Sequence, residues 1–167
     1  SSDVCSSDLT IFDEHPIVGT LETTVREWLD EIGILDFDVV KTSDDEVFRF
    51  YLNSSEFNEE KVNIADVGFG VSQVVPIVIA GLLDHSETLI LEQPEIHLHP
   101  KMQMKLADFI LSMATSGKKF IIETHSEHFI LRIKKLVREG KIKKEDVSIV
   151  CVESGSDGSS VTAIELD

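Results

Sequence analysis

The chain has 167 residues, of which 42% are hydrophobic and 28% are charged. This composition is typical of a globular protein and excludes a disordered or fibrous class, and the length favours one domain with a hydrophobic core. The formal net charge of −16 argues against a chain that grips DNA or RNA by itself, because such surfaces carry an excess of Lys and Arg. Basic residues do gather between Arg132 and Lys144, and we interpret them as a solvated helix face.

The cysteines and the hydropathy of the sequence indicate the cellular compartment of the protein. Cys5 and Cys151 lie far apart without a CxxC spacing, so the sequence indicates neither a disulfide framework nor a local zinc clip. The sequence contains no run of about 18 apolar residues and no basic-then-apolar start. We therefore expect a cytoplasmic protein that does not contact the membrane.

The N-terminal third predicts a helix followed by a β-hairpin. Residues 1–18, with Ser-Ser-Asp repeated, are interpreted as a tail or as sequence foreign to the fold. From Gly19 onward, apolar residues recur at helical spacing up to Gly33. Residues 35–42 and 46–53 then alternate apolar and polar side chains around the turn sequence Ser43 to Asp45, which predicts two paired strands.

An acidic linker separates this hairpin from a run of helices and buried strands. Residues 74–83 are apolar and follow a glycine-containing loop, which predicts a buried helix with Ser72 as its N-cap and Pro76 near its first turn. Residues 88–92 and 119–124 are short apolar runs typical of parallel strands covered on both faces. Helices are predicted from Pro100 to Gly117 and from Ser126 to Gly140.

Two further strands, residues 147–153 and 160–166, close the chain around a turn-rich stretch. The alternation of helices and strands predicts an α/β fold with a mostly parallel sheet flanked by helices, preceded by the N-terminal β-hairpin.

Polar triplets end two of the three strands that are predicted to be parallel. Glu92-Gln93-Pro94 follows the first strand and Glu123-Thr124-His125 follows the second. Ligands of open α/β sheets bind at the carboxyl ends of the strands. A rigidly held carboxylate there suits a nucleotide-bound magnesium ion, and a neighbouring acid or amide can orient an attacking water.

Three stretches in this order, "DVGFGVSQVVP", "TLILEQPEIHLHP" and "KKFIIETHSEHFI", resemble the second half of an ATP-binding head of the ABC type, a P-loop NTPase fold. The most similar group is the SMC-like and OLD-like AAA ATPases of prokaryotes, in the subgroup with a C-terminal domain of unknown function. The resemblance implies ATP hydrolysis with Mg²⁺ in the service of an unidentified process such as DNA repair or phage defence. It assigns residues 19–153 to the C-terminal half of the head and residues 154–167 to the start of a C-terminal β extension.

Matching residue by residue, the resemblance places Glu92 where the family's Walker B carboxylate serves the magnesium shell. Gln93 stands where many relatives have the glutamate that polarises the attacking water, and an amide can orient water but cannot accept its proton. Glu95 is the substitute carboxylate nearest in sequence. His125 matches the switch histidine that contacts the γ-phosphate.

The loop from Gly68 to Gln73 resembles the signature motif, with Gly68, Gly70, Ser72 and Gln73 as its nucleotide-binding residues. In such heads the signature serves the neighbouring subunit, so the resemblance implies a homodimer of heads with ATP between them and Ser72 acting in trans. No G-x-x-x-x-G-K-[ST] motif occurs in the sequence. The resemblance therefore implies an incomplete fold that needs an N-terminal P-loop segment and is inactive alone, with any nucleic acid bound through other regions.

Three alternatives stay open. The His and Glu residues at positions 92, 95, 97, 99, 123, 125 and 128 offer ligands for zinc or manganese. Residues 148–158 also resemble the first strand and acidic loop of a Toprim nuclease domain, although a β-hairpin with an acidic turn is favoured. Gln93 and the missing P-loop are also compatible with an interaction domain that has lost ATPase function.

Overall fold

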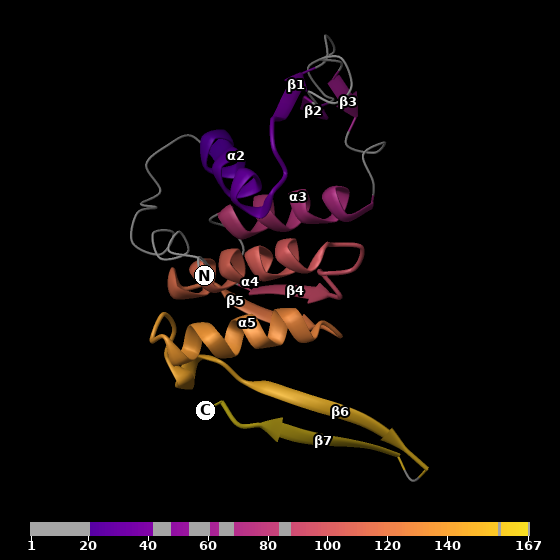
Figure 1. The fold of residues 1–167 in the computed structure, drawn as a ribbon, viewed down its shortest axis with the longest axis vertical. Helices are drawn as coiled ribbons and strands as arrows, with labels where there is room; N and C mark the ends of the chain where they lie inside the picture. The colour runs from indigo at the N-terminus through magenta and orange to yellow at the C-terminus, as the bar shows by residue number, and fades with distance from the viewer. Residues whose placement is uncertain are drawn as a thin grey trace, which may run out of the picture.

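The computed structural model describes residues 21–41, 48–53, 61–63, 69–83, 88–156 and 158–166. Its elements are α2 (Leu21–Ile32), β1 (Phe37–Lys41), β2 (Phe48–Asn53), β3 (Lys61–Asn63), α3 (Phe69–Leu82), β4 (Thr88–Glu92), α4 (Pro100–Thr115), β5 (Lys119–Glu123), α5 (Glu127–Arg138), the 3₁₀ turn Lys144–Asp146, β6 (Ile149–Gly155) and β7 (Gly158–Ile164). In Figure 1 the helices α2, α3, α4 and α5 follow one another down the picture, with β4 and β5 drawn between α4 and α5.

Helix α2 buries one face against the rest of the molecule, as its apolar spacing predicts. Val25, Trp28, Leu29 and Ile32 are all buried, and the Trp28 ring meets Phe109 of α4 edge to face, with centroids 5.1 Å apart and planes at 74°. Gly33 adopts a positive φ of 105° and ends the helix.

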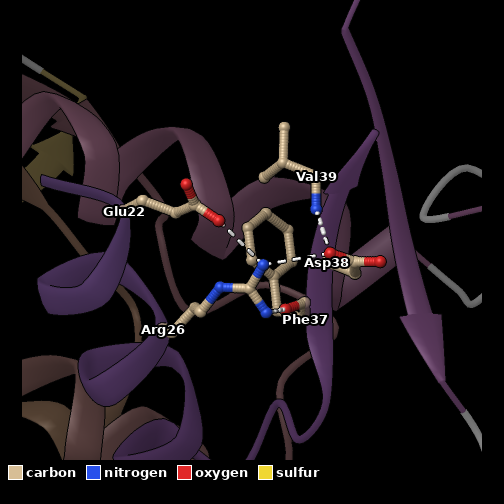
Figure 2. A network of polar contacts seen from close by, with 5 residues as sticks. All are labelled: Glu22, Arg26, Phe37, Asp38 and Val39. Atoms are coloured by element: carbon tan, nitrogen blue, oxygen red, sulfur yellow. Dashed lines mark hydrogen bonds and ion pairs between the residues drawn. The ribbon is translucent and has the colours of Figure 1, made fainter. Parts of the chain in front are cut away.

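A salt-bridged network joins α2 to β1 (Figure 2). Arg26 Nη2 lies 2.9 Å from Glu22 Oε1 and 3.0 Å from Asp38 Oδ1, and Arg26 Nη1 donates to the carbonyl oxygen of Phe37. The hydrogen bonds to Glu22 and then to Asp38 raise the pKa of Arg26. Because arginine is charged at neutral pH, Arg26 joins α2 to β1 through its contacts with Asp38 and Phe37.

Strands β1, β2 and β3 form a small antiparallel sheet. The register pairs Phe37 with Leu52 and Tyr51 with Asn63, which confirms the predicted hairpin. The third strand, β3, was not predicted, because three residues within an acidic stretch carry too little alternation to signal a strand. The predicted turn at residues 43–45 lies outside the described residues.

Helix α3 begins earlier than the sequence suggests. It starts at Phe69 and contains Pro76, so the prediction of Ser72 as the N-cap is wrong, and Pro76 lies beyond the first turn. Proline in a helix interior costs about 3 kcal/mol. Burial of Val74, Val75 and Val78 offsets this cost, because each buried aliphatic side chain contributes about 1.5–3 kcal/mol.

Strands β4 and β5 form the parallel pair, in the register Leu89 with Phe120 through Glu92 with Glu123. Alternate side chains pack inward: Leu89 is buried, and Leu91, Phe120 and Ile122 lie against the main hydrophobic cluster. On the other face Ile90 and Ile121 lie opposite each other and are 76% and 60% exposed. Within the described residues the pair is therefore covered on one face only, where the sequence predicted cover on both.

Helices α4 and α5 pack side by side and share a buried ion pair. Arg132 donates from Nε and Nη2 to the two carboxylate oxygens of Asp108, at 2.6 and 2.9 Å, and both side chains are almost fully buried. Next to it, Leu111, Leu136 and Ile142 form a second hydrophobic cluster.

The last two strands form the favoured β-hairpin. Strand β6 pairs antiparallel with β7, with Ile149 opposite Ile164 and Gly155 opposite Gly158, and Figure 1 shows this ribbon extending beyond α5. The third strand of the predicted parallel set therefore pairs with its own successor, because a short glycine turn closes an antiparallel pair at lower entropic cost than a crossover. The expected boundary between residues 153 and 154 falls inside β6. Within the described residues, the helices are all too short or too polar to span a membrane.

Candidate functional site

The carboxyl ends of β4 and β5 bring two acids to one edge of the sheet. Glu92 and Glu123 are register partners in the parallel pair, and both are exposed. The backbone N–H of Gln93 donates to the carbonyl oxygen of Glu123 at 2.8 Å, which extends the ladder by one residue. The two polar triplets, which begin at Glu92 and Glu123, thus start at the same edge of the sheet.

Residues 93–99, the β4–α4 loop, turn sharply after Glu92. Ile96 N–H donates to the Gln93 carbonyl and Leu98 N–H to the Glu95 carbonyl, both at 3.1 Å. Gln93 and His97 have positive φ values of 44° and 62°, a region that costs an L-residue about 1–2 kcal/mol. The loop is therefore a tightly wound turn that surrounding contacts must hold in place.

Glu95 connects this loop to the loop that follows β5, residues 124–126, the β5–α5 loop. Its Oε1 accepts the backbone N–H of His125 at 2.9 Å, although the two residues are 30 positions apart in the chain. Glu95 is only 6% exposed, and its Oε2 has no hydrogen-bond partner within the described part of the chain. The predicted substitute carboxylate is thus buried and already bonded through one oxygen.

The His125 imidazole remains open to solvent. Its side chain is 78% exposed, and its Nε2 lies 4.0 Å from Oε1 of Glu123, a side chain that is 61% exposed. The His125 backbone is fixed by Glu95, while the ring is free to meet a ligand. Gln93, in the β4–α4 loop, is half-buried.

A glutamine that sequence reasoning did not single out also joins the two loops. Gln103, in the first turns of α4, donates from Nε2 to the Leu98 carbonyl at 2.9 Å, and its Oε1 accepts the Ser126 hydroxyl at 2.6 Å. Ser126 Oγ in turn accepts the N–H of Phe129 at 3.0 Å, which confirms Ser126 as the residue that opens α5. Amphipathic helices ordinarily carry polar residues such as Gln103, so the sequence gives no signal that this side chain bridges the two loops.

The first turn of α3 packs on the β4–α4 loop. A Cβ added to the buried Gly70 would lie 2.8 Å from the His97 carbonyl oxygen and 2.9 Å from a Leu98 methyl group, so only glycine allows this approach. Ser72 is half-buried and Gln73 is exposed in the same turn. Gly68 lies outside the described residues, so its predicted role stays a prediction.

The alternative of a transition-metal centre finds no support in the geometry. Within the described ranges, which include His97, His99, His125 and His128, no group of three or more His, Cys, Asp or Glu side chains could hold a metal ion. Helix α5 starts at Glu127, so His125 and His128 do not share a helical face. His99 instead caps α4, where its Nδ1 accepts the N–H of Lys101 at 3.3 Å.

Comparison with known proteins identifies the family. The AAA ATPase domain family matches residues 14–130 of the chain. The chain belongs to the AAA ATPase domain family. Among curated proteins, this AAA ATPase domain is 29% identical over 98 residues to the energy-coupling factor transporter ATP-binding protein EcfA2 of Mycoplasmoides gallisepticum, a match that covers 56% of the chain and 31% of that protein. The chain therefore spans about a third of the length of this relative.

Solved structures show that this AAA ATPase domain has the fold of SMC ATPase heads. An SMC ATPase studied for ATP-driven dimerization and DNA-stimulated activation matches with a TM-score of 0.62 at 11% identity, over 87% of this chain and 84% of that one. The SMC head domain of Pyrococcus furiosus, with an extended coiled coil and bound to the C-terminal domain of ScpA, matches with a TM-score of 0.64 at 10% identity, over 87% of this chain and 35% of that one. These likenesses confirm the α/β, P-loop NTPase type of fold.

The residues of this AAA ATPase domain fit one side of a magnesium–nucleotide site. A nucleotide-bound Mg²⁺ takes one or two protein carboxylates and completes its shell with phosphates and water, and Glu92 offers an exposed carboxylate at the sheet edge. The phosphate cradle is not encoded in these 167 residues, since the sequence has no P-loop motif.

Proposed function

We propose that the chain is the part of an SMC- or ABC-type ATPase head that binds Mg²⁺ and contacts the γ-phosphate of ATP. The observation that carries this proposal is the shared sheet edge. Glu92 ends β4 in register with Glu123, and His125, two residues beyond Glu123, is bonded through its backbone to the loop that follows Glu92. A carboxylate and an imidazole from separate strands can therefore act on one triphosphate.

The proposed roles follow from the side-chain chemistry. Glu92 binds the magnesium shell, His125 contacts the γ-phosphate, and Gln93 orients the attacking water. Catalysis of phosphoryl transfer is mainly positioning and charge stabilisation. Because the Gln93 amide cannot accept a proton, it lowers the rate of hydrolysis more than the affinity for nucleotide.

We infer that a segment outside the 167 residues contributes the P-loop. Strands of parallel sheets are normally buried on both faces, yet Ile90 and Ile121 form an exposed apolar pair on the outer face of β4 and β5. Because exposed apolar side chains are normally covered in parallel sheets, we infer that the P-loop half of the head covers this face. Such a segment would also supply the phosphate-binding amides and lysine.

A second head completes the proposed site, in a homodimer with ATP between the two subunits. The first turns of α3 carry Ser72, which is half-buried, and Gln73, which is exposed, and the positive end of a helix dipole favours phosphate. We infer that Gly68, Gly70, Ser72 and Gln73 face the nucleotide held by the other head. We propose that the cycle drives an unidentified cytoplasmic process, for which DNA repair and phage defence are two candidates, with any nucleic acid bound elsewhere.

The experiment that tests the proposal is replacement of His125 by alanine in the full-length protein. We expect turnover of Mg²⁺-ATP to fall at least about tenfold, which corresponds to roughly 1.4 kcal/mol in the barrier, because the γ-phosphate loses a partner in the transition state. Steady-state phosphate release measures it. His128→Ala is the matched control, since His128 is also exposed but lies within α5, and this variant should keep wild-type turnover.

Unchanged turnover in His125→Ala would contradict the proposed role. A wild-type protein that binds ATP without turning it over would instead favour the alternative of an inactive binding domain, to which Gln93 points.

A further inference from the structure

Two side chains tie the β4–α4 loop to the β5–α5 loop at adjacent residues. Glu95 Oε1 accepts the N–H of His125 at 2.9 Å. Gln103 Oε1 accepts the hydroxyl of Ser126 at 2.6 Å, while Gln103 Nε2 donates to the Leu98 carbonyl at 2.9 Å. The His125 backbone N–H and the Ser126 side chain, in adjacent residues, are thus both fixed to the loop that carries Gln93.

The Glu95 side chain is buried, which costs folding free energy that its contact with His125 offsets only in part. The side chain is 6% exposed, and only one of its oxygens has a partner in the described part of the chain. Burying an incompletely bonded carboxylate costs free energy that an apolar side chain would not. The oxygen that is bonded holds the His125 N–H, and the shielded carboxylate is poorly placed to meet a solvent-derived water.

The strained turn around Glu95 needs the same contacts. Gln93 and His97, which flank it, both have positive φ, and such conformations persist only where neighbouring groups determine them. The Glu95–His125 bond, the Gln103–Leu98 bond and the close approach of Gly70 to the His97 carbonyl supply that support from three different elements.

We propose that Glu95 and Gln103 form a brace that sets the position of His125 relative to Glu92 and Gln93. The inference rests on the proposed function, since His125 contacts the γ-phosphate there. Both are positioning residues: Glu95 acts through the backbone of His125, and Gln103 acts through Ser126 and the Leu98 carbonyl. Glu95 is accordingly not the base that replaces the glutamate missing at position 93.

The test combines ATP turnover with amide hydrogen exchange in the full-length protein. Glu95→Ala should lower kcat about tenfold and change the KM for ATP less than about threefold. It should also speed exchange of the His125 amide at least about tenfold. Glu95→Gln keeps a carbonyl oxygen that accepts the same N–H, so it should restore most of the turnover and of the protection. A general base at position 95 predicts instead an inactive Glu95→Gln, even though its His125 amide would be equally protected.

Gln103→Leu and Leu111→Val complete the design. Gln103→Leu should lower kcat and expose the Ser126 segment to exchange, and it carries the test if Glu95→Ala does not fold. Leu111→Val, in the second hydrophobic cluster, should reduce stability and leave kcat and His125 exchange unchanged. A protected His125 amide with wild-type kcat in Glu95→Ala would overturn the brace. Absence of turnover in the wild type would overturn the proposed function alone, since the exchange measurements still decide the brace.

Discussion

Replacing Glu92 by glutamine is expected to lower ATP turnover by the full-length protein at least about 100-fold, or roughly 2.7 kcal/mol in the barrier. The exposed carboxylate at the end of β4 is the proposed magnesium ligand. A neutral amide of the same size is a weaker ligand for a hard cation and stabilises less of the charge that develops during phosphoryl transfer. Phosphate release measured across a Mg²⁺ titration checks the result.

Two features of that titration separate ligand loss from general damage. The Mg²⁺ concentration needed for half-maximal rate should rise in Glu92→Gln, whereas ATP affinity should change little. Glu145→Gln, an exposed acid in the 3₁₀ turn after α5, removes the same charge elsewhere and should behave as wild type. Equal turnover in Glu92→Gln and Glu145→Gln would show that Glu92 is not a magnesium ligand.

Replacing Asp108 by alanine is expected to destabilise the packing of α4 on α5 by about 3–5 kcal/mol, because it removes the carboxylate that accepts two hydrogen bonds from the buried Arg132 charge. Both nitrogens that Arg132 uses are within 2.9 Å of the Asp108 carboxylate, so the replacement removes both of these hydrogen bonds. Native-state hydrogen exchange of the α4 and α5 amides in the full-length protein gives the local free energy of opening.

The double replacement Asp108→Leu with Arg132→Met gives the sharper comparison. An apolar pair of similar volume avoids the desolvation of two charges, so its cost should be less than about 1 kcal/mol. The single variant should therefore be the less stable of the two. A double variant that opens as readily as Asp108→Ala would show that the ion pair itself, and not the relief of an unpaired charge, stabilises this interface.

The sequence predicts much of the fold because each signal is local. Apolar spacing marks α2, and Ser126 opens α5 through a contact with Phe129, three residues later. The short apolar runs of β4 and β5 end in polar triplets, and this pattern alone predicts that Glu92 and His125 lie at one sheet edge.

The sequence does not reveal contacts between distant residues. Glu95 reaches the His125 backbone across 30 positions and Gln103 reaches Ser126 across 23, and neither contact leaves a periodic or compositional trace. The start of α3 was also misplaced, since burial of its valines and the approach of Gly70 to the His97 carbonyl outweigh the capping preference of Ser72. Strand β6 was assigned to the parallel set because its pairing with β7 depends on a turn and not on its own composition.

The most direct test of the account is a structure of the full-length protein with Mg²⁺ and a non-hydrolysable ATP analogue. We predict that Glu92 lies in the coordination shell of the metal, directly or through a water, and that the His125 imidazole lies within hydrogen-bonding distance of the γ-phosphate of the same nucleotide. A nucleotide bound away from the carboxyl ends of β4 and β5, or one that only one of these two side chains can reach, would contradict it.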